Sequence, residues 1–170
     1  MIKQTLIIFT TALLIVSCKQ ADKATGSEEL KNTMTEPLRK NNKVEIALAF
    51  MNAYINNANK MDKSINLVDY IQADSFTTNT FKSELKKIVD DAYRIDPELG
   101  PEADPIFDAQ DYPDKGFELE SMDEKLNYLI LKGKNWPDFK VTIKVVEENG
   151  KWLVDGCGMV NIPADKRAAR

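Results

Sequence analysis

The sequence predicts an α+β fold in which N-terminal helices pack on a four-stranded antiparallel sheet. Apolar residues recur at steps of three and four over 43–59 and 74–96, which indicates amphipathic helices. After Gly100 the pattern changes to a two-residue alternation that is typical of strands with one buried face. The dipeptide Asn149-Gly150 separates two such segments and favours a type I′ hairpin turn.

The first 17 residues predict a secretory signal peptide. Lys3 supplies a positive charge, and the apolar run over 6–16 is shorter than the roughly 20 residues that span a bilayer. Ser17-Cys18 then resembles the lipobox of bacterial lipoproteins. The resemblance implies cleavage before Cys18 and a lipid on its sulfur. The alternative is an ordinary signal peptide with a chance cysteine.

Residues 18–42 comprise this cysteine and a polar segment with no apolar period, which predicts a flexible tether. A coil of 24 residues spans about 25–30 Å, enough to hold a domain clear of a membrane. One α+β domain is expected over 43–162, followed by a disordered basic tail over 163–170. We expect the protein in the bacterial envelope, anchored in the outer membrane and facing the periplasm.

Two strong helices and one weaker element are expected before the sheet. The helix over 43–59 begins at a plausible N-cap, Asn42, and 61–73 forms a short helix or turn. The helix over 74–96 is capped by Thr77 or Thr78 and ends before Pro97. Its apolar face comprises Phe81, Leu85, Ile88, Val89, Ala92 and Tyr93.

Four strands are expected, over 116–121, 125–131, 139–147 and 151–160. The third alternates cleanly, so one face is buried and the other faces water. Cys157 lies between two glycines in the last strand, with Asp155 rather than a cation nearby. This context favours a buried thiol, and the glycines indicate a bulge or a close backbone approach.

Composition excludes several function classes. The chain has no histidine, which removes Ser-His-Asp and Cys-His catalysis and zinc sites built on histidine. A net charge of -4 argues against nucleic-acid binding. If Cys18 carries lipid, one thiol remains and no intramolecular disulfide forms. We therefore predict a protein that is not an enzyme and that uses no cofactor and no metal.

Acidic residues are concentrated over 90–124, which contain thirteen acids and only two basic residues, Arg94 and Lys115. Calcium binding is the most specific hypothesis for such a segment, but the spacing of the acidic residues does not match an EF-hand loop. A carboxylate pair acting as acid and base is another alternative. A solvated acidic surface, which would also steer a basic partner, is the favoured interpretation.

Two motifs carry a resemblance to a known family. Residues 104–111 read Asp-Pro-Ile-Phe-Asp-Ala-Gln-Asp, and 147–155 read Glu-Glu-Asn-Gly-Lys-Trp-Leu-Val-Asp. An opening helix with an aromatic-rich face precedes the first motif, and an antiparallel sheet that closes on the second motif follows it. This order resembles domain-of-unknown-function family 3828, small exported bacterial proteins of which many are lipoproteins. The resemblance covers about 43–160 and implies a cystatin-like or nuclear-transport-factor-2-like α+β cone. It implies no catalytic mechanism, and some relatives of similar shape are immunity proteins against secreted toxins.

The first motif has a structural and a functional interpretation. Structurally, Asp104 caps a turn that opens with Pro105, with apolar residues buried around it and Gln110 and Asp111 bonded to loop backbone. Functionally, polar side chains would line the mouth of the cone and bind a polar ligand: Asp104, Asp108, Gln110, Asp111 and Tyr112. Trp136, in a turn between strands, is either a core residue or an exposed anchor for a partner.

The sequence thus favours a non-catalytic cell-envelope lipoprotein, a binding or accessory module for an envelope protein or a small polar ligand. The alternative is an immunity-type inhibitor of a secreted toxin, and a carboxylate-based hydrolase is a third hypothesis. The expected membrane contact is the lipid anchor, and no nucleic-acid partner is expected. The identity of the ligand and the oligomeric state stay open.

Overall fold

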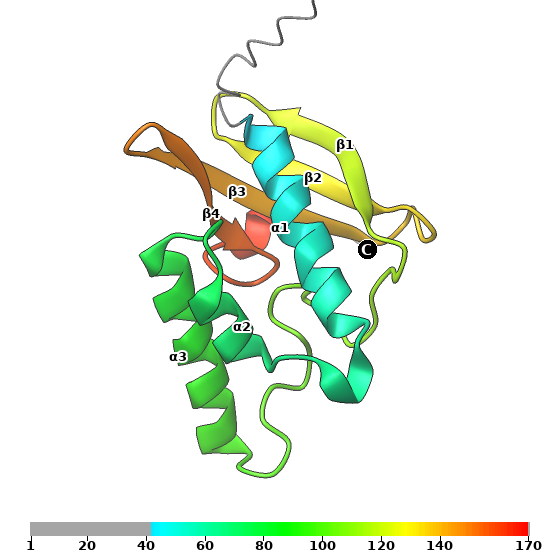
Figure 1. Cartoon of the computed structure of the whole chain (residues 1–170), viewed down its shortest axis with the longest axis vertical. Coiled ribbons are helices and arrows are strands. Elements are labelled where there is room, and N and C mark those ends of the chain that lie inside the picture. Colours follow the sequence, from blue (N-terminus) through cyan, green and yellow to red (C-terminus); the bar gives the residue numbers. More distant parts are fainter. Residues whose placement is uncertain (1–41, 170) are drawn as a thin grey trace, which may run out of the picture. The chain divides into compact units, whose positions relative to one another are not determined.

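A computed structural model describes residues 42–169, so the predicted signal peptide, Cys18 and the tether up to residue 41 lie outside the described residues. Within them, three α-helices precede a four-stranded antiparallel sheet, which confirms the predicted α+β class (Figure 1). No helix in this part of the chain is both long and apolar enough to cross a membrane. The elements in chain order are α1 (Lys43–Ala58), η1 (Met61–Lys63), α2 (Leu67–Ala73), α3 (Asn79–Ile95), β1 (Phe117–Asp123), β2 (Tyr128–Gly133), β3 (Lys140–Glu148), β4 (Lys151–Cys157) and η2 (Ala164–Lys166).

The sheet is a simple meander in the order β1-β2-β3-β4. The β3–β4 turn has Asn149 at φ 51° and Gly150 at φ 76°, which confirms the type I′ geometry expected from this dipeptide. Two-residue turns of this type keep the right-handed twist of the flanking strands, so register is set locally here. Neighbouring strands pair over five to six residues each.

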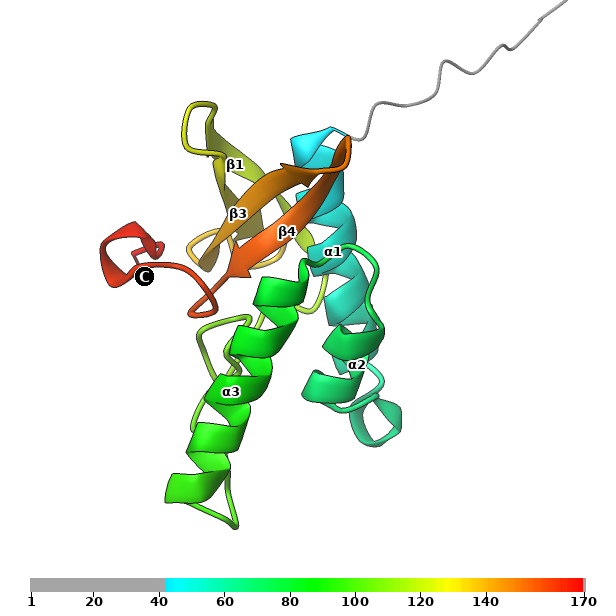
Figure 2. The ribbon, with the colours of Figure 1, turned by 90° about the vertical axis from the view of Figure 1, so that its left-hand side faces the viewer.

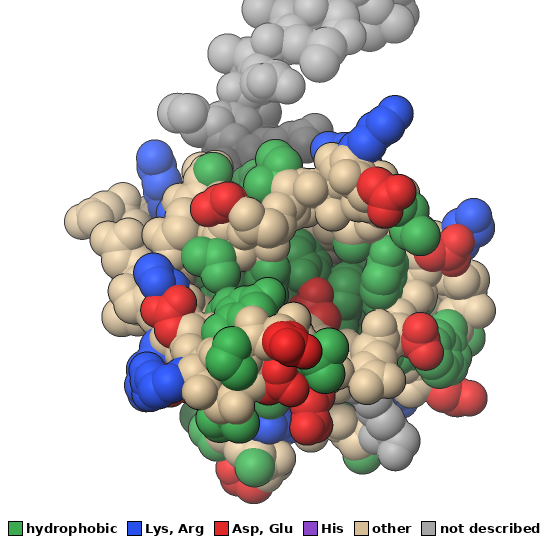
Figure 3. Space-filling view, turned by 90° about the horizontal axis from the view of Figure 1, so that it is seen from below, with side chains coloured by type: hydrophobic (Ala, Val, Ile, Leu, Met, Phe, Trp, Pro, Cys, Tyr) green, Lys and Arg blue, Asp and Glu red, His purple; other side chains and the backbone are tan. Residues whose placement is uncertain are grey.

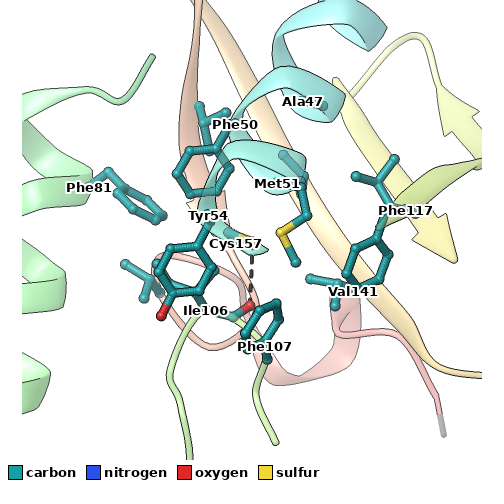
Figure 4. Close-up of a cluster of buried hydrophobic side chains, with 14 of the residues drawn as sticks. Ala47, Phe50, Met51, Tyr54, Phe81, Ile106, Phe107, Phe117, Val141 and Cys157 are labelled. Atoms are coloured by element: carbon teal, nitrogen blue, oxygen red, sulfur yellow. Dashed lines mark hydrogen bonds between the residues drawn. The ribbon is translucent and has the colours of Figure 1, made fainter. Parts of the chain in front are cut away.

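Helix α1 lies across the inner face of the sheet and supplies six buried hydrophobic residues to the core (Figures 1 and 4). Its N-cap is the predicted Asn42, whose Oδ1 accepts from the backbone N–H of Val44 at 3.0 Å. Ala47, Phe50 and Met51 are fully buried, and they face apolar side chains of the central strands. The buried hydrophobic residues of the four strands are Phe117, Leu129, Leu131, Val141, Ile143, Val145, Val154 and Cys157.

Helix α3 begins at Asn79, so residues 74–77 of the predicted range lie outside it, whereas the predicted cap is confirmed at Thr78. The Oγ1 of Thr78 accepts from the Phe81 N–H at 3.0 Å. The preceding residues are extended because they pair with β4: the Thr78 N–H donates to the Val154 carbonyl, and the Val154 N–H donates to the Phe76 carbonyl. This pairing with a strand far along the chain overrides the local helical pattern and covers part of the β4 edge.

The outer face of the sheet is covered where the sequence predicts a solvated one. Thr142 on β3 is buried, and its hydroxyl donates to the Lys166 carbonyl at 2.8 Å. The C-terminal segment therefore packs on the sheet, and the prediction of a disordered tail is wrong for 163–169. Arg167 holds this segment, since its guanidinium donates to the carbonyls of Ile162 and Met159.

The last strand ends in the close backbone approach expected from its glycines. The register between β3 and β4 shifts at Asp155, whose Cα has no register partner on β3. Asp155 is therefore the extra residue of a bulge between the Lys144–Gly156 and Val145–Val154 pairs. A Cβ on Gly158 would lie 2.3 Å from the Ile106 carbonyl oxygen, so only glycine allows this contact. Cys157 is fully buried, as predicted, and its Sγ donates to the same oxygen at 3.5 Å.

Candidate functional site

The turn at the start of the first motif is capped as predicted. One carboxylate oxygen of Asp104, Oδ1, accepts from the N–H groups of Ile106 at 2.7 Å and Phe107 at 3.1 Å. Backbone bonds between Asp104 and Ala109, and from the Asp108 N–H to the Asp104 carbonyl, close the turn. Ile106 and Phe107 are completely buried beneath it. The motif thus fastens the long α3–β1 connection to the end of β4.

The second oxygen of Asp104, Oδ2, accepts a hydrogen bond from the hydroxyl of Tyr54 on α1. Burial raises the pKa of the Asp104 carboxyl above its usual range, although the bonds from Tyr54 and the two amides lower it in part. Burial, and then the charge of Asp104, also raise the pKa of Tyr54. No lysine or arginine within 42–169 forms an ion pair with Asp104. Hydrogen bonds therefore hold this partly buried charge.

Aromatic rings pack around this pair. The Tyr54 ring lies 5.0 Å from that of Phe107 and 5.8 Å from that of Tyr70, measured between centroids. Phe107 in turn stacks on Tyr112 at 4.6 Å with nearly parallel planes. Figure 4 shows Tyr54, Phe107 and Ile106 meeting Cys157 from different elements. These contacts make Asp104 part of a packed junction between α1 and the motif.

The five polar residues proposed for ligand binding are close in the chain, but they make different contacts. Asp104 contacts Tyr54, and Tyr112 stacks on Phe107. Asp108 has a left-handed backbone with φ 54°, and Asp111 is exposed. Gln110 donates from its amide nitrogen to the Glu102 carbonyl at 3.1 Å, a bond to loop backbone of the kind expected. Gln110 also lines a separate groove, whereas a shared ligand site for all five stays a prediction.

This groove, which we call the α3 groove, lies between the C-terminal end of α3 and the following loop. It has a volume of about 670 Å³ and is lined by Ala92, Ile95, Asp96, Leu99, Gly100, Pro101, Glu102 and Gln110. Figure 3 views this end of the domain from below and shows a hollowed surface with hydrophobic side chains in it and acidic side chains beside it. Its lining thus combines apolar side chains, chiefly Ile95 and Leu99, with the carboxylates of Asp96 and Glu102 at its margin and the amide of Gln110.

Ile95 and Leu99 are the most exposed large apolar side chains of the described residues, at 87% and 78% of their surface. Phe81, Leu85 and Val89 on α3 are buried at steps of four residues, whereas Ile95 lies six residues after Val89, about 120° away around the helix. Ile95 instead follows the half-buried Ile88 by seven residues, on the flank of the stripe. Helix α3 extends past the sheet (Figure 2), and Ile95 lies in its last turn, where its side chain is exposed. One flank of the apolar face of α3 therefore reaches beyond the buried part of the helix.

A tight turn holds Leu99 in this exposed position. Asp96 Oδ1 accepts from the N–H groups of Glu98 and Leu99, both at 3.0 Å, and the Gly100 N–H donates to the Asp96 carbonyl at 2.9 Å. Gly100 has φ +67°, and a Cβ there would lie 2.6 Å from the Tyr93 ring. Because the backbone groups of the turn are bonded, Leu99 is displayed by an ordered segment.

The surroundings of the α3 groove are strongly acidic. Residues 90–111 contain eight acidic side chains and one basic side chain, Arg94, which pairs with Asp91 at 2.8 Å. Apart from the partly buried Asp104, these acids are spread over the surface, where Asp90 also pairs with Lys86 at 2.5 Å. Within 42–169, no three or more of the side chains that commonly ligate metals are grouped to hold an ion. The carboxylates therefore form a diffuse negative surface around an apolar centre.

Trp136 is the other residue singled out from the sequence. It is 44% exposed, and its ring lies 5.1 Å from that of the buried Phe139. One part of the indole therefore packs on the core while the rest faces solvent. Trp136 thus combines features of a core residue with those of an exposed anchor. A role as a partner anchor stays a prediction.

Sequence reasoning missed Ile95 and Leu99 as surface residues. The available signal was two large apolar residues on either side of Pro97, which marks the helix end, since neither belongs to the predicted apolar face of α3. Comparison with known protein families, with curated proteins and with solved structures gave no match to this chain. The resemblance to domain-of-unknown-function family 3828 therefore stays a prediction.

Proposed function

We propose that this chain is a non-catalytic binding module of the bacterial cell envelope, anchored by a lipid on Cys18. The observation that carries the binding role is the pair of exposed apolar side chains at the end of α3 and in the following turn, Ile95 and Leu99, which line one groove. Apolar groups displayed together on an ordered surface are typical of interaction sites. The binding surface is accordingly assigned to the α3 groove.

The arrangement of the domain supports this assignment. Helix α1 begins at Lys43 at one end of the domain, and α3 ends at the opposite end (Figure 1). In a protein tethered through residues 18–42, the α3 groove therefore lies at the end of the domain remote from the attachment point. That position suits a module that meets a partner at a distance from its membrane.

The chemistry of the domain favours binding over catalysis. Asp104 and Tyr54, whose pKa values are both raised, bond to each other, and the carboxylate also caps a turn. Cys157 is buried with its Sγ on a carbonyl oxygen, far from the conditions that make a thiolate reactive. The groups whose chemistry could most readily support catalysis thus have structural roles.

The anchor and the binding role are tested separately. The Cys18→Ser variant should leave the membrane fraction or accumulate unprocessed, and a variant that fractionates like the wild type would contradict the anchor. For binding, amine-reactive crosslinking of intact producing cells should give one dominant adduct of defined mass. Recovery of only uncrosslinked protein under conditions that capture known envelope complexes would contradict a binding module.

A further inference from the structure

We propose that the α3 groove binds a basic segment of a partner protein, one that places apolar side chains beside lysine or arginine. This proposal rests on the binding function above and specifies the chemistry of the partner. Its two parts are the apolar centre made by Ile95 and Leu99 and the acidic margin around it.

The apolar centre can receive side chains without first being ordered. Ile95 lies in the last turn of a 17-residue helix, and Leu99 follows in a turn whose amides are bonded to Asp96. A groove of about 670 Å³ is wide enough for a few apolar side chains. Because the receiving surface is already fixed, little conformational entropy is lost on its side when a partner binds.

The acidic margin selects the charge of the partner. Asp96 and Glu102 line the groove, and Glu98 lies between them in the chain. The arginine nearest to them in the chain, Arg94, already pairs with Asp91. Complementary charge would raise the association rate and disfavour acidic competitors. A lysine or arginine two to four residues from an apolar anchor would reach these carboxylates.

The same charges argue against other occupants. In a symmetric dimer through this face, the acidic margin of one copy would meet that of the other, which is destabilising. An anionic lipid surface or a nucleic acid would be repelled in the same way. A basic protein segment is the occupant that satisfies both the apolar centre and the margin.

The test is photo-crosslinking in cells that produce the full chain, with p-benzoylphenylalanine at position 99. The control places it at position 126, in the β1–β2 hairpin, where Leu126 is 51% exposed. An adduct should form from position 99 and not from 126. Mass spectrometry should map the contact to a segment of another protein with net positive charge and apolar residues.

Charge variants test the margin. The triple variant Asp96→Asn, Glu98→Gln, Glu102→Gln keeps the oxygen of residue 96 that accepts the turn amides, and it should reduce the adduct about tenfold. A matched variant, Asp62→Asn, Glu147→Gln, Glu148→Gln, removes the same charge from distant exposed positions and should leave the adduct unchanged. Equal thermal unfolding of the two variants verifies that the fold is retained.

Several results would overturn the proposal: equal adducts from positions 99 and 126, a contact segment without basic residues, or insensitivity to the groove variant. An adduct with a second copy, with lipid or with residues 19–41 of the same chain would identify a different occupant. The same photo-crosslinker is also placed at position 136, in place of the exposed Trp136. An adduct from position 136 but not from 99 would leave the binding function intact and reject the α3 groove. Adducts from none of positions 99, 126 and 136 would reject both.

Discussion

The bond from Tyr54 to Asp104 joins α1 to the turn of the first motif, and the substitution Tyr54→Phe isolates its contribution. The change removes only the hydroxyl and leaves the ring contacts with Phe107 and Tyr70 in place. It also leaves both amide bonds to Asp104 Oδ1. The perturbation is therefore confined to one hydrogen bond on a partly buried carboxylate.

The expected loss follows from the charge of the acceptor. Hydrogen bonds to charged groups contribute about 1.5–3 kcal/mol, and partial exposure of Asp104 lets water replace some of this, so we expect about 2 kcal/mol at neutral pH. With an unfolding entropy near 2.1 cal/mol/K per residue over the 128 described residues, that loss lowers Tm by about 7 °C. At acid pH the carboxyl is neutral, and the loss should fall to about 1 kcal/mol.

The assay is urea unfolding of wild type, Tyr54→Phe, Asp104→Asn and the double variant. Asparagine keeps an oxygen for the turn amides, so the cycle isolates the interaction of the hydroxyl with the charge. Tyr93→Phe, at a half-exposed ring on α3, is the control and should change stability by less than about 0.5 kcal/mol. If Tyr54→Phe costs the same with and without the Asp104 charge, our account of this junction is refuted.

Three further outcomes are expected. Because burial raises the pKa of Asp104, the folded state binds the carboxyl proton more tightly than the unfolded state does. The contribution of Asp104 to stability therefore falls as pH rises from about 3.9 through the raised pKa. Urea midpoints from about pH 3 to pH 7 should show this fall in the wild type relative to Asp104→Asn, and parallel curves would contradict it. Gly158→Ala should destabilise the fold by more than about 2 kcal/mol, because φ is +59° and the new Cβ would meet a carbonyl oxygen at 2.3 Å. Gly150→Ala, at φ +76° but in open space, should destabilise it by about 1–2 kcal/mol when both variants are compared by thermal unfolding. Equal losses would show that the carbonyl contact at Gly158 contributes nothing. Ile95→Ser should change the free energy of unfolding, measured with urea, by less than about 0.5 kcal/mol, because the side chain is exposed. Leu85→Ala, at a buried position of α3, should lower it by about 2–5 kcal/mol. A large loss at Ile95 would show that it belongs to the core.

Features set by neighbouring residues could be predicted from the sequence. The Asn42 cap depends on an amide two residues away, and the Asn149-Gly150 turn depends on two backbone angles. The Asp104 cap is local in the same sense, since its amide donors lie two and three residues ahead. In each case the physical cause lies within one turn of chain, so composition and spacing are sufficient.

Features set by distant residues could not. The start of α3 depends on β4, about 75 residues later, which pairs with the segment before Thr78. Burial of Thr142 depends on a C-terminal segment that crosses the outer face of the sheet. Helical periodicity and strand alternation contain no information on such contacts, and both predictions were wrong there because the tertiary contact overrode the local pattern.

The α3 groove belongs to neither class, and this is what makes it informative. The helical pattern correctly identifies an apolar stripe through Val89, whereas Ile95 lies on the flank of that stripe, seven residues after the half-buried Ile88. Ile95 is exposed because no other described element covers the last turn of α3, which extends past the sheet. Native sequences are consistent across levels except where function requires otherwise. Exposed apolar side chains beyond the core, held by an ordered turn and surrounded by acids, therefore point to a surface that a second molecule completes.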